Sequence, residues 1–136
     1  MKKIKTEYNL KVEFFDLDPM NVVWHGNYLK YIEEARCDML EKIGYTYKNM
    51  QRDNTAYPVA TMDLKYIKPA SFGQKLRVES TLESVEPAMI INYIIKDAES
   101  GEKIFKARSM QIRIDATTKE SLYNAHENFL KKIEEY

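Results

Sequence analysis

The sequence predicts an α+β fold in which one long amphipathic helix packs against an antiparallel sheet. Apolar residues recur at helical spacing from Tyr28 to Ile43, and they alternate with polar residues in several short segments on either side. One helix followed by a run of strands is typical of an α+β protein. The 136 residues suffice for a hydrophobic core, so we expect a single domain spanning residues 1–136.

The first predicted strand covers Glu7 to Phe15, and the residues that share its apolar face are Tyr8, Leu10, Val12 and Phe14. The predicted helix covers Tyr28 to Ile43, with Tyr28, Ile32, Ala35, Met39 and Ile43 on its apolar face. Asn27 is a plausible N-cap and Gly44 a plausible terminator. We expect no other long helix before the C-terminus.

Strands dominate the rest of the chain. Alternation predicts strands over Ala60–Tyr66 and Leu76–Leu82, and Met89–Lys96 is apolar on both faces, which predicts a central strand. The last predicted strand covers Ile104 to Asp115.

Three finer features complete the predicted order of elements. Asp97 to Glu102 has the composition of a hairpin turn. The apolar phase shifts between Phe105 and Met110, which suggests a bulge there. Leu122 to Glu134 is predicted to form a short terminal helix.

The composition excludes several classes of function. Basic and acidic residues balance at 21 each, which argues against a nucleic-acid surface, because duplex binding needs a basic footprint. The basic N-terminus has no apolar stretch behind it, as a signal peptide would, and no apolar run approaches the length of a membrane span. With one cysteine, no internal disulfide is possible. We therefore expect a cytoplasmic protein with no membrane partner.

The main functional signal is the run Phe15-Asp16-Leu17-Asp18-Pro19-Met20-Asn21-Val22-Val23-Trp24-His25-Gly26-Asn27-Tyr28. It places the Asp18 carboxylate in a turn shortly before the start of the helix. A helix N-terminus offers unpaired N–H groups with positive dipole character. A carboxylate facing such donors can attack a carbonyl, or direct water at it, while the donors hold its oxygen. Taken alone, an aspartate before a proline is also typical of a simple turn former.

This run resembles the signature of hotdog-fold acyl-CoA thioesterases, specifically the 4-hydroxybenzoyl-CoA thioesterase-like family. A weaker similarity lies at Tyr66-Ile67-Lys68-Pro69-Ala70-Ser71-Phe72-Gly73-Gln74, which resembles the strand-to-turn segment after the family's long helix. The resemblance covers nearly the whole chain in order. It implies a curved antiparallel sheet wrapped around one long central helix, and homodimers or homotetramers with sites at the subunit interface.

The resemblance also implies a reaction: hydrolysis of an acyl-CoA to a carboxylic acid and free CoA, without a metal or redox cofactor. Asp18 takes the position of the catalytic carboxylate, either as nucleophile or as general base for water. The backbone N–H of His25 takes the position that holds the thioester oxygen. The His25 imidazole as a base remains an alternative, and Asp16 is expected to be structural, with its carboxylate bonding turn N–H groups.

Substrate binding is assigned to four further residues of the run, namely Met20, Trp24, Gly26 and Asn27. Relatives often carry small residues where this chain has Met20 and Asn21. Met20 adds an apolar side chain that can line the acyl pocket, and asparagine tolerates a left-handed backbone. Gly26, in a turn that Asn27 helps to order, would keep the backbone open to the substrate.

The remaining candidates are weaker. Basic residues that could meet the CoA phosphates are Lys68, Lys75, Arg77, Arg108, Arg113 and Lys119. Cys37 is expected to be a small core residue and His126 to be solvated. Two other functions stay open: a hotdog hydratase or dehydratase, and a non-catalytic module that binds acyl thioesters.

Overall fold

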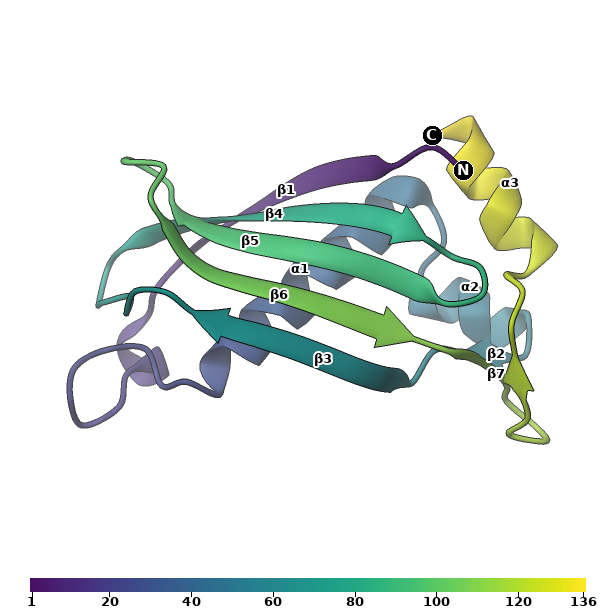
Figure 1. Ribbon diagram of the computed structural model, residues 1–136, viewed down its shortest axis with the longest axis horizontal. Helices are drawn as coiled ribbons and strands as arrows, with labels where there is room; N and C mark the ends of the chain where they lie inside the picture. The colour runs from purple at the N-terminus through teal and green to yellow at the C-terminus, as the bar shows by residue number, and fades with distance from the viewer.

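The computed structural model describes residues 1–136 and shows a five-stranded antiparallel sheet with one long helix behind it (Figure 1). The strand order is β1-β4-β5-β6-β3, which confirms the predicted α+β class. These strands are β1 (Ile4–Lys11), β3 (Val59–Tyr66), β4 (Lys75–Ser84), β5 (Met89–Asp97) and β6 (Lys103–Gln111). A small second sheet contains β2 (Thr55–Ala56), β7 (Arg113–Asp115) and β8 (Ser121–Leu122).

The helices are α1 (Asn27–Ile43), α2 (Tyr47–Arg52) and α3 (Glu127–Glu135), with a short 3-10 turn at Phe14–Asp16. All five residues of the predicted apolar face of α1 are buried. Gly44 ends α1 with a left-handed backbone (φ 93°), and its N–H donates to the carbonyls of Leu40 and Glu41. The predicted terminator is therefore confirmed. No helix of the structure combines the length and the apolar character needed to cross a bilayer.

The core lies between α1 and the inner face of the sheet. The inward residues of the central strand β5 are Met89, Ile91, Tyr93 and Ile95, and none of them is exposed. Their neighbours on the outer face are half-buried. The prediction of a central strand over Met89–Lys96 is thus confirmed, because strands pair with β5 on both sides.

The edge strand β3 is the least covered strand of the sheet. α1 makes its close backbone contacts with β1 and β4, at the opposite side of the sheet (Figure 1). The inward side chains of β3 are therefore partly open to solvent, with Leu64 37% and Tyr66 49% exposed. This open inner face of β3 ends beside the N-terminus of α1.

The first strand begins and ends earlier than predicted, at Ile4 and Lys11 rather than Glu7 and Phe15. The chain leaves the sheet because the Asp16 carboxylate accepts the Glu13 N–H and closes a 3-10 turn. Phe14 is consequently 74% exposed instead of facing inward.

The last predicted strand is two strands, β6 and β7, separated at Ile112. The irregularity also differs from the predicted one. Ile95 of β5 pairs with Phe105 of β6, and the next residue, Lys96, pairs with Lys103, so Ile104 is an extra residue in β6. Because of this bulge, Ile104 and Phe105 are both buried. From Phe105 to Gln111 the inward phase is unbroken.

Two helix predictions need correction, and one short helix was not predicted. Asn27 is the first residue of α1 rather than its N-cap, a position that Gly26 takes. The terminal helix begins at Glu127, not Leu122, because Leu122 belongs to β8 and His126 caps α3 through its Nδ1 atom. The short helix α2 was not predicted.

Candidate functional site

The segment between β1 and α1 folds back on itself as a narrow loop. Leu17 pairs with Val23, and on either side Asp18 N–H donates to Val22 O (2.9 Å) and Trp24 N–H donates to Asp16 O (3.0 Å). At the tip, Asn21 N–H donates to Asp18 O at 3.0 Å, and Asn21 takes a left-handed backbone with φ 63°. An asparagine tolerates this conformation, so the turn forms although the small residues of relatives are missing.

Asp18 lies at the start of this tip and is half-buried. Its Oδ1 atom accepts the Met20 N–H at 2.8 Å, which fixes the direction of the carboxylate. Its Oδ2 atom forms no hydrogen bond within the chain. Asp18 therefore combines the role of a turn former with one free carboxylate oxygen.

Asp16 holds the loop together from inside. Its carboxylate, 2% exposed for the residue as a whole, accepts from Lys30 Nζ at 2.7 Å, from the Tyr31 hydroxyl at 2.9 Å and from Glu13 N–H at 3.0 Å. Burial alone would raise the pKa of Asp16, but these donors, led by Lys30, lower it below its usual range. The predicted structural role of Asp16 is confirmed.

The N-terminus of α1 presents unused donors at His25, Gly26 and Tyr28. The backbone N–H groups of these three residues donate to no acceptor in the chain. The carbonyl of His25 accepts the Tyr66 hydroxyl at 2.8 Å, which ties this peptide to the end of β3. The imidazole of His25 is exposed.

A small pocket of about 180 Å³ opens beside this helix end. Val23, His25, Tyr28, Tyr66, Ile67 and Lys68 are among its lining residues. Tyr28 is buried, as predicted for the first core residue of the helix, and its ring stacks on Phe105 at 4.8 Å between centroids. The rings of Tyr28 and Tyr66 thus line the pocket together with His25, whose backbone N–H is unpaired.

Gly26 is needed for space rather than for backbone freedom. Its φ is −72°, which any residue adopts. A Cβ atom at this position would lie 2.3 Å from the ring of Trp24. The Trp24 ring therefore covers the helix N-terminus only because residue 26 has no side chain.

The other predicted substrate-binding residues occupy different parts of the loop. Asn27 donates its side-chain amide to the carbonyl of Asp16 at 2.8 Å, so it braces the loop. Met20 projects from the tip and is 80% exposed. Asp18 lies on the segment of the loop that leads to the tip, and His25 lies on the returning segment. Two pairs of facing residues, Leu17–Val23 and Asp16–Trp24, come between them along the loop.

Two expectations outside the loop are wrong. Cys37 is exposed on α1 rather than in the core, because its position on the helix faces away from the sheet. His126 is partly buried rather than solvated, since its Nδ1 atom accepts Asn128 N–H at the start of α3.

The six basic residues considered for the CoA phosphates lie in different surroundings. Arg77 pairs with Glu79, Arg113 donates to Thr55 and Asn124, and Lys119 donates to the carbonyl of Ala116. Lys75 is exposed at the start of β4. Lys68 lines the pocket beside His25 and also pairs with Glu102 at 3.0 Å. Arg108 lies elsewhere, on the outer face of the sheet.

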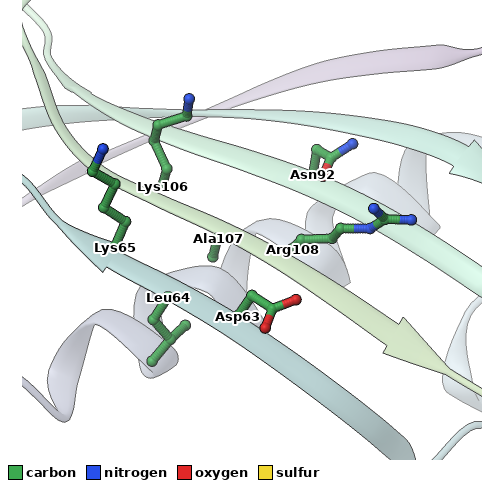
Figure 2. A pocket seen from close by; sticks show the side chains of 7 residues that line it. All are labelled: Asp63, Leu64, Lys65, Asn92, Lys106, Ala107 and Arg108. Atoms are coloured by element: carbon green, nitrogen blue, oxygen red, sulfur yellow. The ribbon is translucent and has the colours of Figure 1, made fainter.

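That outer face carries an open hollow of about 250 Å³ over β3, β5 and β6. Figure 2 shows Lys65, Lys106 and Arg108 around it, with Asn92 and Asp63 beside Arg108. Lys65 lies directly opposite Lys106 across the strand pair, and neither forms an ion pair.

Sequence reasoning missed the contact between Tyr66 and His25, and the donors that hold Asp16. Tyr66 stood out only as part of the second motif, and alternation places it in a strand without indicating what its hydroxyl touches. Lys30 and Tyr31 follow Asp16 by 14 and 15 residues, and only the fold of the loop brings them to it.

Comparisons with known proteins identify the family of the chain. A family model described as the thioesterase-like superfamily matches residues 12–133. The chain is 28% identical over 107 residues to the putative acyl-CoA thioesterase YneP of Bacillus subtilis, covering 78% of this chain and 77% of that protein. It is 28% identical over 114 residues to the long-chain acyl-CoA thioesterase FadM of Escherichia coli, covering 83% and 86%. The match to the acyl-acyl carrier protein thioesterase ATL3 of Arabidopsis thaliana covers 80% of this chain but only 58% of that protein, at 26% identity.

Solved structures show the same fold. A DHNA-CoA thioesterase from Staphylococcus aureus superimposes with a TM-score of 0.86 at 22% identity, covering 96% of this chain and 89% of that one. The probable thioesterase YbaW of Escherichia coli gives 0.82 at 26% identity, covering 94% and 96%. The protein SAV2348 from Staphylococcus aureus, solved in complex with CoA, gives 0.87 at 17% identity, covering 100% and 85%. These likenesses confirm the predicted hotdog fold.

Proposed function

The chain belongs to the thioesterase-like superfamily, and we propose that it is an acyl-CoA thioesterase that releases a carboxylic acid and free CoA. The observation that carries this proposal is the loop between β1 and α1. It holds a carboxylate with one free oxygen, at Asp18, together with unpaired backbone donors at the start of α1. A nucleophile or general base and oxyanion donors are groups that catalyse thioester hydrolysis.

In this proposal the thioester carbonyl lies at the N-terminus of α1, where the His25 N–H donates to its oxygen. Charge that develops on that oxygen is stabilised by a fixed donor and by the helix dipole. Asp18 then acts on the carbonyl carbon, either as a nucleophile or as a base that takes a proton from water. In the first case a mixed anhydride forms, the CoA thiolate leaves, and water cleaves the anhydride. In the second case water attacks directly.

Tyr66 supports the oxyanion role of His25. Its hydrogen bond to the His25 carbonyl restrains the peptide that precedes Gly26. The imidazole is not required for a backbone donor. The rings of Tyr28 and Tyr66 line the pocket and lower the polarity around the carbonyl, which strengthens the interaction with the donors.

The CoA phosphates are the natural partners for two groups of basic residues. Lys68 lies at the pocket beside His25. Lys65, Lys106 and Arg108 surround the outer hollow (Figure 2). Like charges directly opposite each other across two strands are destabilising without a counter-charge, and the facing pair Lys65 and Lys106 has none in the chain. An anionic ligand would supply it.

We also propose that the active form is a homodimer or homotetramer built from a single domain of residues 1–136. The support is the edge strand β3, whose backbone is free on one side and whose inner side chains are partly exposed. Pairing of β3 with a second copy would complete the sheet and cover the pocket at the end of β3.

The decisive experiment is Asp18→Asn, measured as thiol release from a panel of acyl-CoAs. An amide keeps the size of the side chain and the acceptor for Met20 N–H, but it is a poor base and a poor nucleophile. We expect kcat to fall by at least about 10²-fold, with little change in CoA-ester affinity by calorimetry. Asp115→Asn is the matched control, because the Asp115 Oδ1 atom also accepts turn N–H groups, from Thr117 and Thr118, far from the loop.

Other outcomes point to the alternatives. Near-normal turnover in folded Asp18→Asn protein would reject the mechanism and favour the His25 imidazole as base. Binding without thiol release from any acyl-CoA would favour a non-catalytic binding module. Hydration of an enoyl-CoA without thiol release would indicate a hydratase.

A further inference from the structure

α1 carries a charged side chain on its buried face. Arg36 is only 3% exposed, and it lies on the same side of the helix as Ile32 and Met39. The mechanism proposed above does not use it. Arginine does not lose its proton in proteins, so this group is a buried cation.

Only part of the hydrogen-bonding capacity of Arg36 is used within the chain. Its Nε atom donates to the Tyr93 hydroxyl at 3.1 Å, and that hydroxyl lies 3.3 Å from the Ser109 Oγ atom. Its Nη2 atom is buried without a hydrogen-bond partner. No carboxylate forms an ion pair with Arg36. Burial lowers the pKa of the guanidinium, and the Tyr93 and Tyr47 hydroxyls raise it by more, so the charge is retained.

An unpaired buried cation is costly, and natural proteins pair such charges. A further buried polar atom without a partner, Ser80 Oγ, lies on β4, where residue 80 is opposite Tyr93. The inner face of the sheet thus has a polar patch whose hydrogen bonds the chain does not complete.

The patch adjoins the open inner face of β3. Tyr66, Leu64 and Met62 face inward there, opposite Phe105, Ala107 and Ser109 of β6 respectively. A strip of partly exposed apolar side chains therefore leads from Tyr66, beside His25, to Met62, beside Ser109. Arg36 is nine residues beyond Asn27, about 14 Å farther along the helix axis.

We propose that Arg36 is a specificity-determining residue that binds the far end of the acyl group, and that this end is a carboxylate. The inference rests on the proposed hydrolase function. An apolar chain matches the strip along β3, and a carboxylate is the group that a guanidinium binds in bidentate geometry. The hydroxyl of Tyr47, a residue that is 43% exposed, also lies near the guanidinium.

The test compares pairs of acyl-CoAs of equal chain length, one ending in a carboxylate and one in a methyl group. For a chain that spans the distance from His25 to Arg36, we expect wild-type kcat/KM to favour the carboxylate by about 10²-fold. Arg36→Met should reduce this ratio to one or below. Arg36→Lys should keep only part of it, because lysine lacks the bidentate geometry.

A second measurement separates this role from a structural one. Arg36→Met replaces an unpaired ion by an apolar side chain of similar length, so the melting temperature of the free protein should stay the same or rise. A fall in melting temperature together with dissociation of an oligomer would show that a carboxylate of a second copy pairs with Arg36, and would overturn the proposal.

Failure of the inference about Arg36 and failure of the proposed hydrolase function give different results. Wild-type hydrolysis of methyl-ended esters without any preference for a carboxylate would reject the inference and leave the proposed function intact. Absence of thiol release from every ester would reject the proposed function. In that case calorimetry with the paired esters tests Arg36 through binding alone. A lower Kd for the carboxylate-ended ester in wild type, lost in Arg36→Met, would support the role of Arg36, and equal Kd values in wild type would reject it.

Discussion

The Tyr66 hydroxyl donates a 2.8 Å hydrogen bond to the carbonyl of His25, across a separation of 41 residues in the chain. This contact joins the end of the edge strand β3 to the peptide that precedes the helix N-terminus. β3 is also an edge strand whose side chains are mostly exposed. The proposed oxyanion site and the proposed subunit interface therefore share this strand, through Tyr66.

Tyr66→Phe removes this hydrogen bond and keeps the ring that packs on Tyr28 and Phe105. A single hydrogen bond contributes about 1 kcal/mol, so we expect kcat to fall about fivefold with little loss of stability. Steady-state thiol release measures the effect. Tyr123→Phe, at an exposed tyrosine that makes no hydrogen bond, is the control. An unchanged kcat would show that the His25 peptide needs no support from β3.

Asp16→Asn should destabilise the protein without removing the proposed catalytic group. The charge-assisted bonds from Lys30 and Tyr31 at 2.7 and 2.9 Å are lost or weakened, which we expect to cost about 2–3 kcal/mol at pH 7. Denaturant unfolding measures the difference. The control is Asp38→Asn, whose i,i+4 pair with Lys42 should contribute only about 0.3–0.5 kcal/mol.

The effect of Asp16 should depend on pH in a defined direction. Its pKa is lower in the folded protein than in the unfolded chain, despite the opposing effect of burial, because Lys30, Glu13 and Tyr31 donate to it. The stabilisation is therefore complete above the unfolded value of about 4 and is lost as the pH falls through the folded pKa. The difference in the free energy of unfolding between wild type and Asp16→Asn should shrink below about pH 4. A difference that stays constant down to pH 2 would contradict this account.

Gly26→Ala should displace the Trp24 ring. The new Cβ atom would lie 2.3 Å from it, whereas the backbone at φ −72° tolerates alanine. Since Trp24 is the only tryptophan, its fluorescence emission reports the shift directly, and we expect kcat to fall while the fold persists. Adding Trp24→Ala removes the clash, so in that background Gly26→Ala should have little further effect. If the losses in kcat from Gly26→Ala and Trp24→Ala were additive, the two residues would not act on each other.

Leu64→Lys should weaken self-association through β3. Leu64 is 37% exposed on the edge strand, so the monomer should fold, while an interface that contains β3 would bury two added charges. Sedimentation should show dimers or larger assemblies for wild type and a shift to monomers for the variant. Tyr123→Lys, at an exposed residue outside the main sheet, should leave assembly unchanged. A stable, active wild-type monomer at micromolar concentration would refute the prediction.

The sequence by itself determined the elements whose signals are local. The period of 3.6 residues identified the buried face of α1, and Gly44 marked its end because only a residue without a Cβ atom enters the left-handed region easily. Alternation identified β3 and β4, and apolar residues on both faces identified β5 as the central strand of the sheet. The spacing of Asp18, His25 and Asn27, through a resemblance to a known family, predicted a site in the loop between β1 and α1, and that prediction awaits the Asp18→Asn experiment.

Tertiary structure decided the features that depend on contacts between distant residues. The first strand stops at Lys11 because Asp16 turns back to Glu13, and alternation continues past that point without any sign of it. Arg36 reaches Tyr93 across 57 residues, and its unpaired Nη2 atom follows from how α1 lies over the sheet. Such contacts are set by register, curvature and packing direction, which the periodicity of one segment does not encode.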